Sequence, residues 1–116
     1  SRQVAISRDG GLSWEDQRID VSLPEPRCQG AMLNIERNGK NVLLFTNPAH
    51  LSSRVNMTLS ISRNNGDSWN EKVTIFEQHA AYSDLAELKN GKIFVLFEAG
   101  VESAYDGIHY KTLSVQ

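Results

Sequence analysis

Apolar and polar residues alternate along most of the chain in short segments. Between residues 55 and 61 every second side chain is apolar and those between are polar, which is the two-residue period of a β-strand with one buried face. Similar short apolar runs recur on both sides of this segment. No stretch repeats its apolar residues at the helical period with caps at its ends. The pattern therefore predicts an all-β protein.

Two Asn-Gly pairs, Asn38-Gly39 and Asn90-Gly91, lie between pairs of these apolar segments. Asn-Gly is a preferred sequence for the two-residue turn of a β-hairpin, because both residues tolerate a positive φ. We therefore expect a two-residue hairpin turn at each pair. The expected strands cover residues 3–7, 13–21, 31–36, 41–46, 55–62, 69–76, 83–88, 93–98 and 107–115.

One eight-residue segment occurs twice. Residues 7–14 return as residues 62–69, at an offset of 55 residues, and five of the eight positions are identical. The shared pattern is S-R-[DN]-x-G-x-S-W. A period near 50 residues is typical of the blades of a β-propeller. The repeat therefore predicts propeller blades.

The residues of the repeat have a structural role in this interpretation. The Asp or Asn accepts hydrogen bonds from turn amides, the Gly after it takes a positive φ, and the Trp anchors the turn to its blade. A catalytic role is disfavoured, because two copies 55 residues apart in a propeller cannot serve one site. The positions are Asp9, Gly11 and Trp14 in the first copy and Asn64, Gly66 and Trp69 in the second.

The expected strands group into one four-stranded blade between two partial ones. A closed propeller needs about four to eight blades, so this chain cannot close a ring. The sequence starts with Ser1 and not with Met. We therefore expect residues 1–116 to form about two to two and a half antiparallel blades, the C-terminal portion of a larger propeller whose remainder completes the fold.

Composition excludes several classes of protein. The chain has 12 Lys and Arg against 14 Asp and Glu, a net charge of −2, which disfavours a nucleic-acid partner. Apolar runs such as Val42–Phe45 and Ile93–Phe97 are far shorter than the roughly 20 residues of a membrane helix. The single Cys28 excludes an internal disulfide, and the three histidines lack metal-ligand spacing. We expect neither a metal nor a cofactor.

The repeat resembles the Asp-box, S-x-D-x-G-x-[TS]-W, of sialidases and several other propellers. Three further stretches, residues 26–30, 47–56 and 81–98, occur in the order and approximate spacing of an exo-α-sialidase. Together they resemble the C-terminal portion of a six-bladed sialidase propeller, with the lysosomal-type enzymes and their bacterial relatives most similar. The resemblance implies a glycosidase that releases terminal sialic acid from sialylated glycans. It is compatible with a lysosomal, secreted or periplasmic location.

By this resemblance Arg54 is the third arginine of the cluster that binds the substrate. Sialic acid carries a carboxylate beside its anomeric carbon, and a planar guanidinium binds a carboxylate through two parallel charge-assisted hydrogen bonds. Taken without its neighbours, Arg54 would be read as an exposed arginine at a strand end. Asn47-Pro48 upstream and the second Asp-box downstream favour the binding role.

Tyr82 matches the catalytic nucleophile of the family. An anionic nucleophile would be repelled by the carboxylate of the substrate, whereas a neutral phenol avoids this repulsion if a nearby base takes its proton. Tyrosine nucleophiles are the recognised exception among retaining glycosidases. The alternative is a half-buried tyrosine of a propeller strand, and the surrounding Ala-Tyr-Ser-Asp-Leu favours the nucleophile.

Two further residues have both a functional and a structural interpretation. Glu98 matches the glutamate that holds the first arginine of the cluster, and its alternative is a solvated glutamate at a strand end. Gln29 either lines the sugar pocket or is a structural amide. We expect Arg54, Tyr82 and Glu98 to face one cleft, with Trp14 and Trp69 at the blade periphery.

The resemblance also implies that the site is incomplete within this chain. The acid/base Asp, two arginines and the Glu that activates the tyrosine have no match here, so the 116-residue chain alone is expected to be inactive. A non-catalytic Asp-box propeller that acts as a binding scaffold is the alternative function. Arg54 and Tyr82 favour the enzyme, because a scaffold needs neither.

Overall fold

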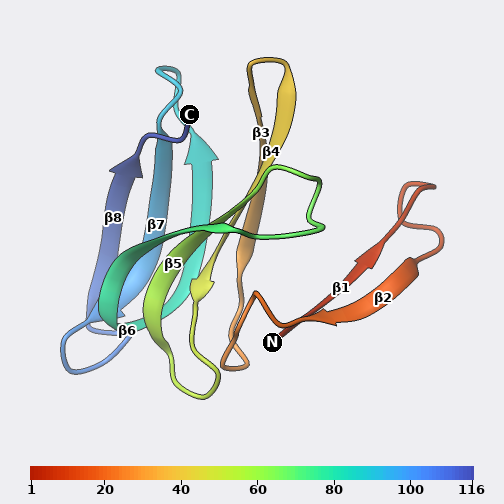
Figure 1. Ribbon diagram of the computed structural model, residues 1–116. Coiled ribbons are helices and arrows are strands. Elements are labelled where there is room, and N and C mark those ends of the chain that lie inside the picture. The colour runs from red at the N-terminus through yellow and green to blue at the C-terminus, as the bar shows by residue number, and fades with distance from the viewer.

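The computed structural model describes residues 1–116 and contains eight strands and no helix. The strands are β1 (Arg2–Ile6), β2 (Glu15–Asp20), β3 (Ala31–Arg37), β4 (Lys40–Pro48), β5 (Val55–Ser62), β6 (Glu71–Glu87), β7 (Ile93–Gly100) and β8 (Gly107–Leu113). β1 and β2 form a separate hairpin, and β3 to β8 form one antiparallel sheet in chain order (Figure 1). The prediction of an all-β protein is confirmed. The structure contains no helix that could cross a membrane.

The strand β6 differs from the prediction. We expected separate strands at 69–76 and 83–88, in two blades, but β6 runs without a break from Glu71 to Glu87. Its first half pairs with β5 and its second half with β7. Residues 76–83 contain no Gly or Pro that would end a strand. β6 therefore curves from one blade into the next, and the two blades share one curled sheet (Figure 1).

The two Asn-Gly turns have different geometries. Asn38 and Gly39 have φ values of 52° and 73°, and Arg37 pairs with Lys40, so this two-residue turn is confirmed. At the second pair only Gly91 has a positive φ, of 81°, and its N–H donates to the carbonyl of Leu88 at 2.8 Å. This turn has a three-residue loop with glycine in the left-handed position, so the two-residue prediction was wrong there.

The first Asp-box is a turn held by one carboxylate. Asp9 Oδ1 accepts the main-chain N–H of Ser13 at 2.9 Å, and Asp9 Oδ2 accepts the Ser13 hydroxyl at 2.6 Å. The Ser7 hydroxyl oxygen accepts the N–H of Gly11 at 2.8 Å. The expected acceptor role of Asp9 is confirmed, and Gly11 has the expected positive φ of 94°.

The second Asp-box repeats this turn with an amide. Asn64 Oδ1 accepts the N–H of Ser68 at 2.9 Å, and the Ser62 hydroxyl oxygen accepts the N–H of Gly66 at 2.9 Å. The remaining bond is reversed: Asn64 Nδ2 donates to the Ser68 hydroxyl at 2.8 Å, whereas Asp9 accepts from a serine. The hydroxyl can act as donor or acceptor, so Asn replaces Asp without loss of a bond.

The two box tryptophans lie in different surroundings. Trp69 is 3% exposed and packs in a small apolar cluster with Leu23 and Phe45. Trp14 is 66% exposed. The expectation of an anchoring role therefore holds for Trp69 and is wrong for Trp14, because the β1–β2 hairpin projects from the sheet with no other strand beside it (Figure 1).

The main core lies between the curled halves of the six-stranded sheet. It contains fully buried side chains from three strands, β4, β5 and β7, namely Leu44, Met57, Leu59, Ile93 and Val95. At one end of the sheet Arg37 joins segments that are distant in sequence. Its guanidinium donates to the carbonyls of Val115 and Gly91 at 2.7 and 2.6 Å and to Glu87 Oε2 at 2.5 Å. Arg37 therefore ties the first hairpin of the sheet to the last.

We predict that Arg37→Ala lowers the free energy of unfolding by about 2 kcal/mol, because hydrogen bonds to a charged donor are lost and carbonyl groups are left without their partner. Urea unfolding of the protein measures this change. Arg63→Ala is the matched control: Arg63 pairs only with Glu71 across an exposed surface, so its removal should cost under about 1 kcal/mol. Equal effects of the two changes would contradict the role assigned to Arg37.

We predict that the first Asp-box, and not the second, depends on pH. The hydrogen bonds from Ser13, and then from Ser7, lower the pKa of Asp9 from 3.8 to about 2. Because the folded pKa is depressed, the stabilisation is complete above the unfolded pKa and is lost as the pH falls toward 2. A carbon-13 NMR titration of the Asp9 carboxyl measures its pKa. A midpoint near 3.8 would show that the carboxylate is not held in this network.

Candidate active site

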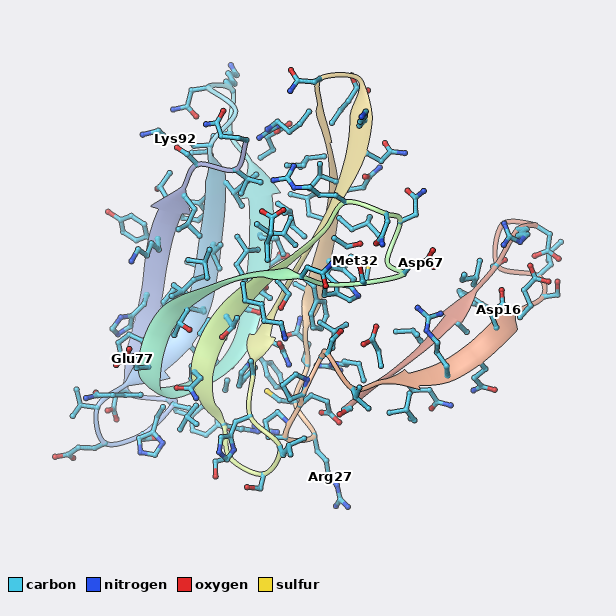
Figure 2. All side chains as sticks on the ribbon, viewed as in Figure 1. Asp16, Arg27, Met32, Asp67, Glu77 and Lys92 are labelled. Carbon is cyan, nitrogen blue, oxygen red and sulfur yellow. The ribbon has the colours of Figure 1, made fainter.

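Three loops meet at the end of the sheet opposite the Asn38-Gly39 turn. They are the segment before β3, the β4–β5 loop and the β7–β8 loop (Figure 1). Figure 2 labels Arg27 at this end, where its side chain points away from the strands. The predicted residues Gln29 and Arg54 lie on the first two loops, and Tyr82 and Glu98 lie on the neighbouring strands β6 and β7.

Tyr82 lies in a β-bulge of β6. Ala80 pairs with Ala99 and Ser83 pairs with Phe97, so β6 uses one residue more than β7 over this interval. A bulge takes a residue out of the ladder and changes the direction of its side chain, and bulges are frequent beside active sites. Tyr82 is 52% exposed, so its phenol is accessible from solvent although both neighbouring strands are largely buried.

Glu98 contacts the main chain of this bulge. Its Oε1 accepts the N–H of Tyr82 at 3.1 Å, across the hairpin formed by β6 and β7. The bulge leaves this N–H without a partner in the ladder, so the carboxylate supplies the missing acceptor. Glu98 is partly buried and has no cationic partner among the ion pairs of the chain. Glu98 therefore bonds the main chain of the bulge with one carboxylate oxygen.

Gln29 makes a two-bond contact with the next residue of β6. Its Nε2 donates to the carbonyl of Ser83 at 3.0 Å, and its Oε1 accepts the N–H of Ser83 at 3.0 Å. The side-chain amide thus pairs with the main chain as a neighbouring strand would. One side of the amide is used for structure, as in the structural interpretation of Gln29. The side chain nevertheless remains exposed at the pocket.

Arg54 stands beside Tyr82. Its guanidinium carbon lies 5.7 Å from the centroid of the Tyr82 ring, within the range of a cation–π contact. Its NH1 donates to the Tyr105 hydroxyl at 2.5 Å, and its NH2 donates to the carbonyl of Arg27 at 3.1 Å. A guanidinium has five N–H donors, so three remain for a ligand, enough for a bidentate contact with a carboxylate.

The main chain also fixes Arg54 relative to Tyr82. The N–H of Ala80 donates to the carbonyl of Arg54 at 2.9 Å. Ala80 lies two residues before Tyr82 on the same strand. The two side chains are therefore held by one strand, although 28 positions separate Arg54 from Tyr82 in the sequence.

Cys28 lies beneath this group and is 6% exposed. Burial raises the pKa of its thiol, against the opposing effect of the positive charges of Arg54 and Arg2. The proximity of Cys28 and the hydrogen bond to Tyr105 raise the pKa of Arg54. Arg54 is thus a permanent cation at the site, and Cys28 is a neutral, buried thiol at neutral pH.

A pocket of about 560 Å³ lies on the same face of β6 and β7. Three of the four predicted site residues line it, and Arg54 lies outside this lining, over the Tyr82 ring. The structure thus brings Gln29, Arg54, Tyr82 and Glu98 together at one place. The full lining consists of Gln29, Tyr82, Ser83, Asp84, Leu96, Phe97, Glu98 and Ile108. No cluster of three or more His, Cys, Asp or Glu side chains is placed to hold a metal ion.

Sequence reasoning missed Tyr105. This residue lies in the β7–β8 loop, where Asp106 Oδ2 accepts the N–H groups of Glu102 and Ser103 at 3.1 and 3.0 Å and so shapes the turn. The turn brings Tyr105 to Arg54, 51 positions earlier in the chain. A loop tyrosine has no local sequence signal for such a contact, so only the folded structure could identify it.

The fold and the repeated turns define the chain as part of an Asp-box β-propeller, and comparisons with known proteins agree. The model of the BNR repeat-like domain family matches residues 1–95. The chain therefore belongs to this family.

The relatives of the chain are sialidases. It is 30% identical over 109 residues to the sialidase of Bacteroides fragilis and 31% identical over 110 residues to that of Micromonospora viridifaciens, which covers 87% and 90% of this chain. The Hadza microbial sialidase Hz136 superposes with a TM-score of 0.81, at 24% identity, over 96% of this chain and 22% of its own; at that identity the likeness establishes the propeller fold alone. The chain spans about a fifth of the curated relatives, 20% and 17% of their lengths.

Proposed function

We propose that the whole protein is a retaining exo-α-sialidase and that residues 1–116 form the C-terminal portion of its propeller, with Asp-boxes at 7–14 and 62–69. One observation carries the proposal: the guanidinium carbon of a permanent cation, Arg54, lies 5.7 Å from the centroid of the Tyr82 ring, and Tyr82 lines an open pocket. The substrate class requires this pair, because sialic acid carries a carboxylate directly beside the carbon that reacts.

Arg54 binds the carboxylate of the substrate in this proposal. Tyr105 and the Arg27 carbonyl hold the guanidinium from one side. Three N–H donors remain unused, and two of them suffice for parallel charge-assisted bonds. The cation also stabilises negative charge that develops on the Tyr82 oxygen as its proton leaves.

Tyr82 is the nucleophile in this proposal. Its oxygen attacks the anomeric carbon and the bond to the leaving sugar breaks, while the phenolic proton passes to a carboxylate base and an acid protonates the leaving oxygen. Water then cleaves the bond between Tyr82 and the sugar, so the configuration is retained overall. The base, the acid and two further arginines come from the remainder of the propeller.

Glu98 and Gln29 complete the site. Glu98 presents a partly buried carboxylate with no cationic partner in this chain, so an arginine from the remainder of the propeller is a suitable partner. Gln29 lines the pocket beside Tyr82.

We predict that Tyr82→Phe in the whole protein lowers kcat for a fluorogenic sialoside by at least about 1,000-fold, because the nucleophilic oxygen is lost while the ring over Arg54 is kept. Substrate binding should change little. Tyr110→Phe is the matched control, since Tyr110 on β8 stacks on Phe94 of β7 and does not line the pocket. Near-normal turnover by Tyr82→Phe would overturn the proposal.

We predict that Arg54→Lys weakens binding of a sialic-acid analogue by about 100-fold, because lysine cannot make the bidentate contact. A neutral sugar should bind equally to both proteins. The control is Arg27→Lys: that side chain points away from the strands (Figure 2), and only its carbonyl contacts Arg54. An equal loss of affinity in the two variants would contradict the role of Arg54.

A further inference from the structure

Side chains bond the main chain of the bulge at Tyr82, in addition to the β6–β7 ladder on either side of it. Over Tyr82 and Ser83, three main-chain groups bond to side chains of other elements: the N–H of Tyr82 to Glu98, and the N–H and carbonyl of Ser83 to Gln29. A bulge disrupts the ladder locally. The orientation of Tyr82 therefore depends on these three bonds.

We propose that Gln29 is a positioning residue that acts with Glu98 to hold the bulge and so fixes the Tyr82 oxygen in place. The inference rests on the proposed role of Tyr82 as the nucleophile. Gln29 acts through the main chain of Ser83 and need not touch the substrate. This role differs from lining the pocket, because it depends on both ends of the amide.

The segment that carries Gln29 is itself rigid. The N–H of Cys28 donates to Glu25 Oε2 at 3.2 Å, and Arg2 donates to the carbonyl of Cys28. A Cβ atom at position 30 would clash with the Phe45 ring, so the main chain at Gly30 passes directly against this ring. The amide of Gln29 is therefore presented to β6 from a fixed support.

The same segment also contacts Arg54. The carbonyl of Arg27, two residues before Gln29, accepts a hydrogen bond from the Arg54 guanidinium at 3.1 Å. Arg27 has a positive φ of 57°, a strained conformation for arginine. One short segment thus positions both the carboxylate-binding cation and, through Ser83, the nucleophile.

Substitution of Gln29 tests the positioning effect more cleanly than substitution of Glu98, because Gln29 is uncharged and its removal does not change the charge of the site. Gln29 is also a better target than the hydroxyls of Ser83 and Thr46, which contact each other at 2.9 Å in the buried interior. Removing that buried contact would affect folding. Gln29 is exposed, so after Gln29→Ala water reaches the Ser83 N–H and carbonyl and the fold is retained. The bulge then loses its constraint, and a displacement of about 1 Å at a reacting group lowers a rate by roughly 100-fold.

The test uses the whole protein with Gln29→Ala and Gln29→Glu, and Gln17→Ala on the exposed strand β2 as the control. For Gln29→Ala we expect kcat for the sialoside to fall by about 10- to 100-fold, with KM changed by less than about threefold. The Ser83 amide should exchange with deuterium faster. A raised KM with unchanged kcat would overturn the inference, because it would show direct substrate binding by Gln29.

Gln29→Glu adds a second measurement, the pH dependence of Ser83 amide exchange. A direct contact between residue 29 and the substrate would not change this exchange rate. A protonated carboxyl donates and accepts like the amide, whereas a carboxylate only accepts. Relative to the unaltered protein, kcat and Ser83 amide protection should both recover as the pH falls toward the glutamate pKa of about 4.3. A constant ratio across this range would overturn the inference.

The two proposals fail in different ways. If Tyr82→Phe stays active, Tyr82 is not the nucleophile, and the positioning inference falls with it even if Ser83 exchange changes. If Tyr82→Phe is inactive while Gln29→Ala keeps normal kcat and normal Ser83 exchange, the sialidase proposal stands and the positioning role of Gln29 is overturned.

Discussion

The hydrogen bond from the Ala80 N–H to the Arg54 carbonyl, 2.9 Å long, marks the point where β6 leaves one neighbour and joins the next. β6 pairs with β5 as far as His79 and with β7 from His79 onward. Every buried main-chain N–H and C=O group of a strand needs a hydrogen-bond partner. Where a strand changes neighbours, some of these groups must therefore find partners other than a strand. Tyr82 lies two residues beyond the change.

At the bulge of β6, side chains supply the hydrogen-bond partners that a neighbouring strand supplies elsewhere. Register shifts occur in β5–β6 around Met57 and in β6–β7 between Ala80 and Ser83. In the second shift Glu98 and Gln29 bond the displaced main chain. The site therefore forms where the fold is least regular, and its irregularity is fully bonded rather than flexible.

Much of the fold could be predicted from sequence because its signals are local. The turn at Asn38-Gly39 and the two Asp-boxes each depend on residues within eight positions, and the structure has them. The continuity of β6 could not be predicted, because a gap in the apolar pattern around residues 77–79 looks like a loop when only the sequence is available. The curvature that exposes these residues is a tertiary effect.

The site was predictable only in part, because some of its contacts join segments that are distant in the sequence. Arg54, Tyr82 and Glu98 lie in motifs that the family resemblance points to, and the structure brings them together. The amide pairing of Gln29 with Ser83 spans 54 positions, and the contact of Tyr105 with Arg54 spans 51. Neither has a sequence signal, because each depends on how two loops meet after the sheet has curled.

Arg54 and Tyr82 are both fixed to β6, whereas Tyr105 is not. Changes in loop length therefore affect the pair and Tyr105 differently. The main-chain bond to β6 fixes the relative position of this pair whatever the length of the β4–β5 loop that precedes Arg54. Tyr105, in contrast, reaches Arg54 from the β7–β8 loop, and loops accept insertions and deletions at little cost. Both loops can therefore lengthen, and the surroundings of Arg54 and Tyr82 can diversify, while this pair stays in register.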